Sequence, residues 1–243
     1  MVKKGDRYAI IGEIQNVDNV PADVVIKGTL YNQENKELAG YSAKYVMSHK
    51  LLPKEISSFR VDFEGIAWLG KNDKIPETFN PDEFTPVELP EPPTKFNLQC
   101  AGNVANTDLY KYVALADVNY AEDQISGTLF NYGIQEVTIP ELIFSYYDEN
   151  KQLVWVNQDF MREGVRVQRK QYFDYDLPNL EEVEIINSSM ENIFVNGLPN
   201  KEIAIKVIPD RKEDHPKQQM QALEGKGYNF IKLELNNYVG NPK

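Results

Sequence analysis

The sequence predicts an all-β protein built from two antiparallel β-sandwich domains in tandem. Three observations predict it. Apolar and polar residues alternate with a period of two, turn-forming residues separate the alternating segments, and three of these segments recur in order about 115 positions later. The chain has 243 residues, of which 42% are hydrophobic and 26% are charged. That length and composition suit two ordinary globular domains, each able to bury a core.

The alternating segments have the pattern of half-buried strands. Residues 10–15, 24–30 and 59–63 each place mainly apolar side chains on one face, and Asn19-Val20-Pro21 is typical of the turns between them. One short helix is expected near residues 217–223, where KQQMQAL follows His-Pro and is barely two turns long. The rest of the chain favours strands.

The recurrence indicates two copies of one folding unit. Three segments recur in order: Gly12–Asn16 at Gly127–Asn131 and Glu34–Leu38 at Glu149–Leu153, both 115 positions on, and Phe59–Phe63 at Phe173–Leu177, 114 positions on. A period of this size exceeds that of a solenoid repeat and matches one β-sandwich domain of about 100 residues. The predicted domains are residues 1–105 and 106–243.

A proline-rich acidic segment, residues 75–95, lies between the two recurring sets. It contains six of the 14 prolines, so it is expected to be extended and stiff. One interpretation is a linker between domains. The other, which we favour, is a crossover inside the first domain, with Phe96–Ala101 returning as its last strand and Glu202–Ile208 as the equivalent strand of the second copy.

These residues resemble the bacterial FxLYD domain, whose pattern runs G-x-x-x-N, then F-x-L-Y-D, a turn, and L-x-P-G-E before a final strand. The first copy has Gly12–Asn16, Leu30-Tyr31-Asn32 and Leu52-Pro53-Lys54-Glu55; the second has the better name-giving strand, Phe144–Asp148. Each copy departs from the pattern, with Gly28 for the phenylalanine in one and Arg166–Arg169 for L-x-P-G-E in the other. The resemblance implies an immunoglobulin-like sandwich in secreted or envelope-attached bacterial proteins, without enzymatic activity or established ligand.

Composition and motifs narrow the classes of function. The formal net charge of −11 disfavours nucleic acid, and no apolar run is long enough for a membrane-spanning helix. The only cysteine, Cys100, is expected to be a small buried apolar residue. Known motifs for hydrolases, nucleotides and calcium are absent, and only His49 and His215 could supply imidazole, so no enzyme, metal or cofactor is expected.

The candidate binding residues are aromatic. Asp148 and Glu149 are interpreted as turn residues rather than catalytic acids, with Asp148 accepting local backbone N–H bonds. Trp68, Trp155 and Tyr147 could face a ligand, although a core position is favoured for Trp155, and Tyr147 is expected on the face opposite Phe144 and Tyr146.

Two functions therefore compete. The first is a non-catalytic extracytoplasmic interaction or spacer module that binds a protein partner. The second is a carbohydrate-binding module that uses exposed Trp and Tyr.

Overall fold

The structure is a computed structural model that describes residues 1–43, 50–63, 89–105, 112–186, 189–195, 205–208 and 220–238. All regular elements in these residues are β-strands, which confirms the predicted all-β class, and none of them forms a helix that could span a membrane. The short helix expected near 217–223 is wrong where the structure describes it, because Gln221–Gly225 form strand β16. A tight turn at Lys226 and Gly227 (φ +87°) pairs β16 with the next strand, and this pairing overrides local helix propensity.

The chain folds into two compact units, each described below by itself. Unit 1 comprises Met1–Val104 and Val183–Val207, and unit 2 comprises Ala105–Glu182 and Ile208–Lys243. The chain first passes between units after Val104, close to the predicted boundary at residue 105. It passes back for Val183–Val207, so this segment belongs to unit 1 and not to the second copy, where residues 106–243 were expected.

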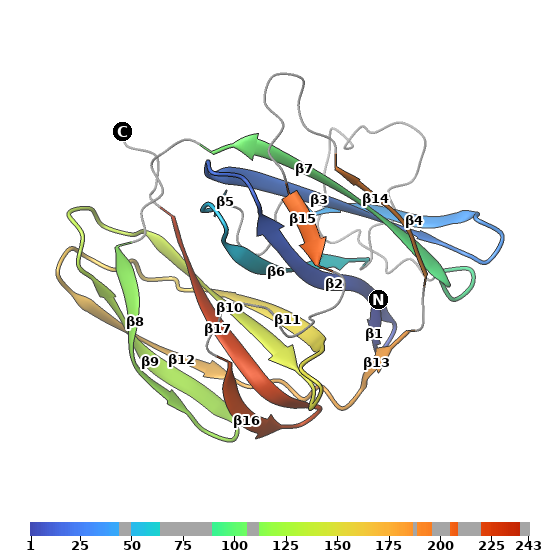
Figure 1. Cartoon of the computed structure of the whole chain (residues 1–243). Coiled ribbons are helices and arrows are strands. Elements are labelled where there is room, and N and C mark those ends of the chain that lie inside the picture. The colour runs from blue at the N-terminus through green and yellow to red at the C-terminus, as the bar shows by residue number, and fades with distance from the viewer. Residues whose placement is uncertain are drawn as a thin grey trace, which may run out of the picture. The chain divides into compact units, whose positions relative to one another are not determined.

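Unit 1 is a sandwich of two five-stranded sheets (Figure 1). In one sheet β2 is central, and in the other β3 lies between β4 and β7. The first sheet contains β1 (Val2–Lys4), β2 (Arg7–Asn16), β6 (Ile56–Asp62), β13 (Val183–Ile185) and β15 (Ile205–Ile208). The second contains β3 (Ala22–Tyr31), β4 (Glu37–Ala43), β5 (Lys50–Leu51), β7 (Lys95–Val104) and β14 (Ser189–Val195).

Strand β7 pairs with β3 over ten residues, from Tyr31 opposite Lys95 to Ala22 opposite Val104. The segment between β6 and β7 is therefore a crossover inside unit 1, as favoured from the sequence, although residues 64–88 of it lie outside the described residues. Period-two alternation fills the space between the sheets with apolar side chains. This core includes Ile10, Ile14, Val24, Ile26, Leu30, Phe59, Val61, Leu98 and Cys100.

Three strands of unit 1 come from the late segment of the chain. Strand β13 pairs with β1, β14 pairs in parallel with β7, and β15 pairs with β2. The alternating pattern of 202–208 predicts a strand, which is confirmed over Ile205–Ile208, but this strand, β15, joins unit 1; residues 202–204 lie outside the described residues. In unit 2, β17 (Tyr228–Tyr238) instead occupies the position beside β10 that β7 occupies beside β3.

Unit 2 repeats the sandwich with a three-stranded and a four-stranded sheet (Figure 1). Their strand orders are β12-β9-β8 and β11-β10-β17-β16, with all pairs antiparallel. The remaining strands are β8 (Val113–Tyr120), β9 (Gln124–Asn131), β10 (Ile139–Tyr147), β11 (Leu153–Phe160) and β12 (Lys170–Asp176). The ring of Phe144 on β10 stacks on Tyr175 of β12, with centroids 3.8 Å apart and planes 13° apart. As predicted, Phe144 therefore faces the sandwich interior.

Cys100 is buried between the sheets of unit 1, as predicted, and burial raises the pKa of its thiol to about 12. Above the unfolded pKa near 9, the unfolded chain loses a proton that the folded chain keeps. The free energy of unfolding should therefore fall by about 1.4 kcal/mol per pH unit between pH 9 and 12 from this group. Urea denaturation at several pH values tests this, and Cys100→Val should lack this part of the slope. An equal slope in both proteins would contradict the prediction.

Candidate functional site

Asn16 and Asn131, which end the first recurring segment in each copy, are buried and hydrogen-bonded through both side-chain groups. Both are 0% exposed. Asn16 Nδ2 donates to the carbonyl oxygens of Val20 (2.8 Å) and Leu51 (3.1 Å), and its Oδ1 accepts from the Asp18 amide (3.0 Å). These three bonds tie the end of β2 to the turn that follows it and to strand β5, so the side chain has a structural role.

Asn131 repeats this arrangement in unit 2. Its Nδ2 donates to the carbonyl oxygens of Gln135 (2.7 Å) and Val165 (2.9 Å), and its Oδ1 accepts from the Gly133 amide (3.0 Å). Its carbonyl oxygen accepts from Gln168, as that of Asn16 accepts from Lys54, each at 2.8 Å. The acceptor and donor positions correspond one by one between the two units.

The hairpin after β10 is built around Asp148. Its Oδ1 accepts from the amides of Asn150 (2.9 Å) and Gln152 (2.8 Å), which confirms the predicted turn-forming role. In unit 1 the same bonds run from Glu34 and Lys36 to Asn32 Oδ1. Asn32 and Asp148 are therefore the equivalent residues, 116 positions apart, and both hold the last position of F-x-L-Y-D. The spacing of 115 positions, at which Glu34–Leu38 matches Glu149–Leu153, is wrong by one residue for this hairpin.

The predicted ligand-facing aromatic residues do not form an exposed site. Tyr147 is 0% exposed and Trp155 is 7% exposed, and Trp68 lies outside the described residues. Trp155 Nε1 donates to Asn157 Oδ1 (2.8 Å), and Asn157 Nδ2 donates to the hydroxyl of Tyr175 (2.8 Å). Trp155 and Tyr147 thus have no free ring face for a sugar, because both side chains are buried.

Tyr146, Tyr175 and Tyr228 form a tyrosine cluster in unit 2. The Tyr146 and Tyr228 rings contact edge to face with centroids 4.9 Å apart. Burial, and then the neighbouring Tyr175, raise the pKa values of both phenols above their ordinary value. A phenol that stays protonated at neutral pH and has no access to solvent is unsuited to proton transfer, so this cluster belongs to the core.

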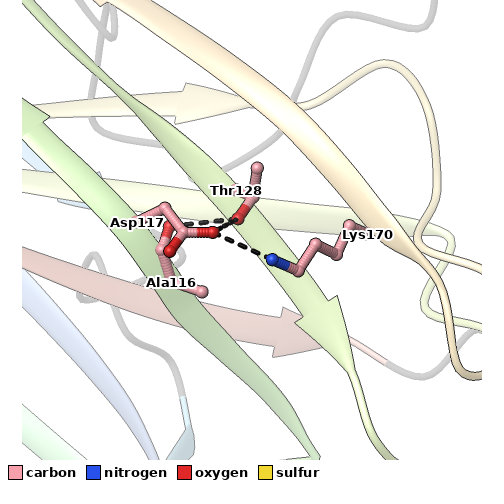
Figure 2. Close-up of polar contacts among 4 residues, drawn as sticks. All are labelled: Ala116, Asp117, Thr128 and Lys170. Carbon is pink, nitrogen blue, oxygen red and sulfur yellow. Dashed lines mark hydrogen bonds and ion pairs between the residues drawn. The ribbon is translucent and has the colours of Figure 1, made fainter.

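The exposed outer face of sheet β12-β9-β8 carries the polar contact shown in Figure 2. Lys170 Nζ of β12 lies 2.9 Å from the Asp117 carboxylate of β8. Between them on β9, Thr128 Oγ1 lies 3.1 Å from the Ala116 carbonyl oxygen and 3.4 Å from Asp117 Oδ2. Asp117 has φ +52° at a bulge of β8, which turns its side chain along this face.

The hydrogen bond and the positive charge of Lys170 lower the pKa of Asp117. Lys170→Met should therefore raise this pKa toward its ordinary value. A lowered carboxyl pKa stabilises the folded chain at pH values above the unfolded pKa, and this contribution is lost as the pH falls through the folded pKa. Carboxyl ¹³C NMR titration measures the change, with Lys226→Met as the matched control. The same Asp117 titration in all three proteins would contradict the prediction.

One end of unit 2, the loop end, combines exposed apolar and basic side chains. Its exposed apolar residues are Tyr112, Tyr132, Ile134 and Val167, and Ile134 is 88% exposed. The loops are held together because the Tyr132 amide donates to the Tyr112 carbonyl oxygen (2.9 Å) and Gln168 Nε2 donates to that of Tyr132 (3.0 Å). The Tyr112 and Tyr132 rings lie edge to face, 5.7 Å apart.

The basic residues of the loop end are Arg162, Arg166 and Arg169, all exposed. None of them forms an ion pair among the described residues. This surface is not among the sites expected from the sequence, although MREGVRVQRK from Met161 to Lys170 carries a dense local positive charge in a chain of net charge −11. Arginine and tyrosine are enriched in protein interfaces, so the loop end is the best candidate binding surface.

No group of three metal-ligating side chains occurs in the part of the chain that the structure describes. His49, His215 and the acidic segment 210–215 lie outside the described residues. The fold and the candidate site together define a class, an all-β protein of two sandwich units with an apolar and basic surface at one end of the second unit.

Comparison with known proteins assigns no family to this class. No family model matches the chain, and no curated protein sequence matches it. Among solved structures, a calcium-binding mutant of Bacteroides uniformis β-glucuronidase 2 is similar at 12% identity and a TM-score of 0.20, over 71% of this chain and 21% of that one. A putative β-galactosidase from Bacteroides fragilis is similar at 13% identity and a TM-score of 0.19, over 70% and 24%. This chain spans less than a quarter of either enzyme, and at these scores the likeness carries no argument about function.

Proposed function

We propose that this chain is a non-catalytic protein-binding module, or spacer, of a bacterial cell-envelope or secreted protein, built from two divergent copies of an FxLYD-like domain. The observation that carries the proposal is the use of the recurring polar residues. Asn16, Asn32, Asn131 and Asp148 direct their side-chain oxygens to backbone amides of their own unit. Residues committed to the fold in this way are not arranged to act on a substrate.

The matching bonds in the two units also support a duplication. Unrelated sandwiches share strand order more readily than they share an asparagine with the same three partners, a turn residue with positive φ and a glycine under an aromatic ring. Lys54 and Gln168 have φ of +67° and +55° at equivalent positions. A Cβ on Gly12 or Gly127 would lie 2.8 Å or 2.9 Å from the ring of Phe59 or Phe173.

The loop end of unit 2 is the surface that we assign to the partner. Exposed tyrosine and isoleucine supply apolar contact area, and the arginines supply paired donors for carboxylates of the partner. The extracytoplasmic location rests on the FxLYD resemblance. The carbohydrate-binding alternative loses Trp155 and Tyr147 as stacking residues, and no exposed pair of coplanar rings replaces them in the described residues.

Binding measurements with matched variants test this function. The purified chain should capture a protein from bacterial envelope extract while binding no sugar on a glycan array. A photo-crosslinking residue at Ile134 should link to that protein, and one at Asn150, in the exposed Asp148 hairpin, should not. Arg166→Glu and Arg169→Glu should each weaken capture about ten-fold, whereas Lys226→Glu, with the same change of charge, should not. A chain that binds sugar on the array and forms no crosslink at Ile134 would reject the proposal.

A further inference from the structure

Among the residues that the structure describes, strand β12 leaves one backbone edge of the unit 2 sandwich open. Its other edge pairs with β9 from Lys170 opposite Phe130 to Asp176 opposite Gln124. The Arg169 carbonyl oxygen accepts from the Asn131 amide (3.1 Å), and the Leu177 amide donates to the Asp123 carbonyl oxygen (2.8 Å). In an antiparallel ladder the backbone groups of alternate residues point to opposite sides, so the odd-numbered residues of β12 face β9.

The even-numbered residues therefore define the open edge of β12: the backbone N–H and C=O groups of Lys170, Tyr172, Asp174 and Asp176. The side chains of these four residues are also exposed, and Tyr172 is 58% exposed. Within the described residues β12 pairs with β9 alone. An unpaired edge of this length is a template for another strand.

The equivalent strand of unit 1 does not offer such an edge. Strand β6 pairs with β2 as β12 pairs with β9, but its residues Ile56, Ser57, Ser58 and Phe59 are all buried. β6 and β12 therefore hold the same position in their sheets but differ in solvent exposure. β12 also carries charged side chains at both of its ends.

The charges of β12 are polarised along the strand. Arg169 and Lys170 lie at its start, and Asp174 and Asp176 lie at its end. A partner strand that runs antiparallel fits best if its acidic end meets the start of β12 and its basic end meets the end of β12. A second β12 has this property, because reversing the strand exchanges its positive and negative ends.

We propose that the open edges of β12 from two copies of this chain pair in an antiparallel ladder and form a symmetric dimer. A two-fold axis at Phe173 aligns all seven residues of β12, with Lys170 opposite Asp176 and Tyr172 opposite Asp174 of the second copy. This register pairs outward-facing residues only with outward-facing residues, which an antiparallel ladder requires. It joins two three-stranded sheets into one of six strands.

The internal contact of Lys170 is compatible with this ladder. Its ammonium group lies 2.9 Å from Asp117, and its three donors allow a second carboxylate, that of Asp176 in the other copy, to be bound on the same face. Charges on an edge strand deter pairing where like charges meet. Here the antiparallel copy brings opposite charges together, whereas a parallel copy in register would place Lys170 beside Lys170 and Asp176 beside Asp176. The dimer is independent of the proposed partner and needs only the purified chain.

Sedimentation velocity over a range of concentrations tests the dimer directly. The ladder buries a small surface, so half of the chains should be dimeric at a concentration on the order of 10–100 µM. Tyr172→Pro should weaken dimerisation at least ten-fold, because proline removes an outward N–H and leaves the bonds to β9 in place. Tyr172→Thr keeps that N–H and should retain the dimer. Wild-type chain that stays monomeric up to about 500 µM, or a Tyr172→Pro dimer of unchanged affinity, would overturn the proposal.

A charge exchange gives a second test that does not depend on proline. Lys170→Asp and Asp176→Lys should each weaken the dimer about ten-fold, because each places like charges opposite one another. The double variant Lys170→Asp/Asp176→Lys should restore the affinity to within about three-fold of wild type. Single variants that weaken the dimer without restoration in the double variant would reject the register. Thermal melting of every variant checks that it is folded.

Discussion

Asn131→Ala is expected to lower the free energy of unfolding by about 3 kcal/mol, because it leaves buried partners without their bonds. The carbonyl oxygens of Gln135 and Val165 would lose their donor, and the Gly133 amide would lose its acceptor. The side chain is 0% exposed, so water does not simply replace it. Urea denaturation followed by circular dichroism measures the change.

Asn16→Ala should have a comparable effect in unit 1, because Asn16 has the same three kinds of partner. Asn150→Ala is the matched control. Asn150 is exposed, and only its backbone amide contributes to the Asp148 turn, so its change should stay within about 0.5 kcal/mol. If Asn131→Ala were as mild as this control, the asparagine would not hold the loops together in the way described.

A fragment of residues 1–105 is expected to be strongly destabilised, although it contains the whole first copy as predicted from the sequence. It lacks β13, β14 and β15, and therefore exposes the outer edge of β7 and one edge each of β1 and β2. A loss of about 3 kcal/mol would lower the melting temperature by roughly 12–24 °C in a domain of this size. Differential scanning calorimetry of the fragment and of the full chain measures this.

A synthetic peptide of residues 183–208 provides the control for the fragment. Added in excess, it should bind the fragment and raise its melting temperature, because it supplies the missing strands, whereas a scrambled peptide should not. A fragment that melts cooperatively within about 5 °C of the full chain, with no response to the peptide, would show that these strands contribute little to unit 1.

The sequence predicted the local features of this protein well, because local features depend on neighbouring residues. Alternation located the strands, and the side-chain chemistry of Asp148 predicted its turn. Matching letters misaligned the hairpins by one position, since Glu34 and Glu149 are identical but exposed residues, whereas Asn32 and Asp148 accept the backbone amides that form each turn. The residues that make bonds, and not those that happen to be identical, define the equivalence.

The pairing of strands could not be predicted in the same way. Residues 202–208 alternate like any half-buried strand, and nothing in them states that β15 pairs with β2. Strand β16 has good helix formers, and only its pairing with β17 makes it a strand. Aromatic residues posed a similar difficulty, because the large rings of Tyr147 and Trp155 suit an interior and an interface equally.

The candidate site was hidden for a different reason. A net charge of −11 describes the whole chain, and it obscured the local cluster of Arg162, Arg166 and Arg169. The polarity of β12 was readable in KQYFDYD, but it becomes meaningful only when the strand is known to lie at a sheet edge with its even-numbered residues outward.

The most direct test of the shared bonding scheme is native-state hydrogen exchange at matched amides, measured by NMR at a concentration where the chain is monomeric. The amides of Lys54 and Gln168 lie in loops with exposed side chains, yet each donates to a buried asparagine carbonyl oxygen at 2.8 Å. Both should be protected nearly as strongly as core strands, while the Tyr172 and Asp174 amides at the open edge should exchange rapidly. Rapid exchange at either Lys54 or Gln168 would contradict the claim that the same set of internal bonds stabilises each unit.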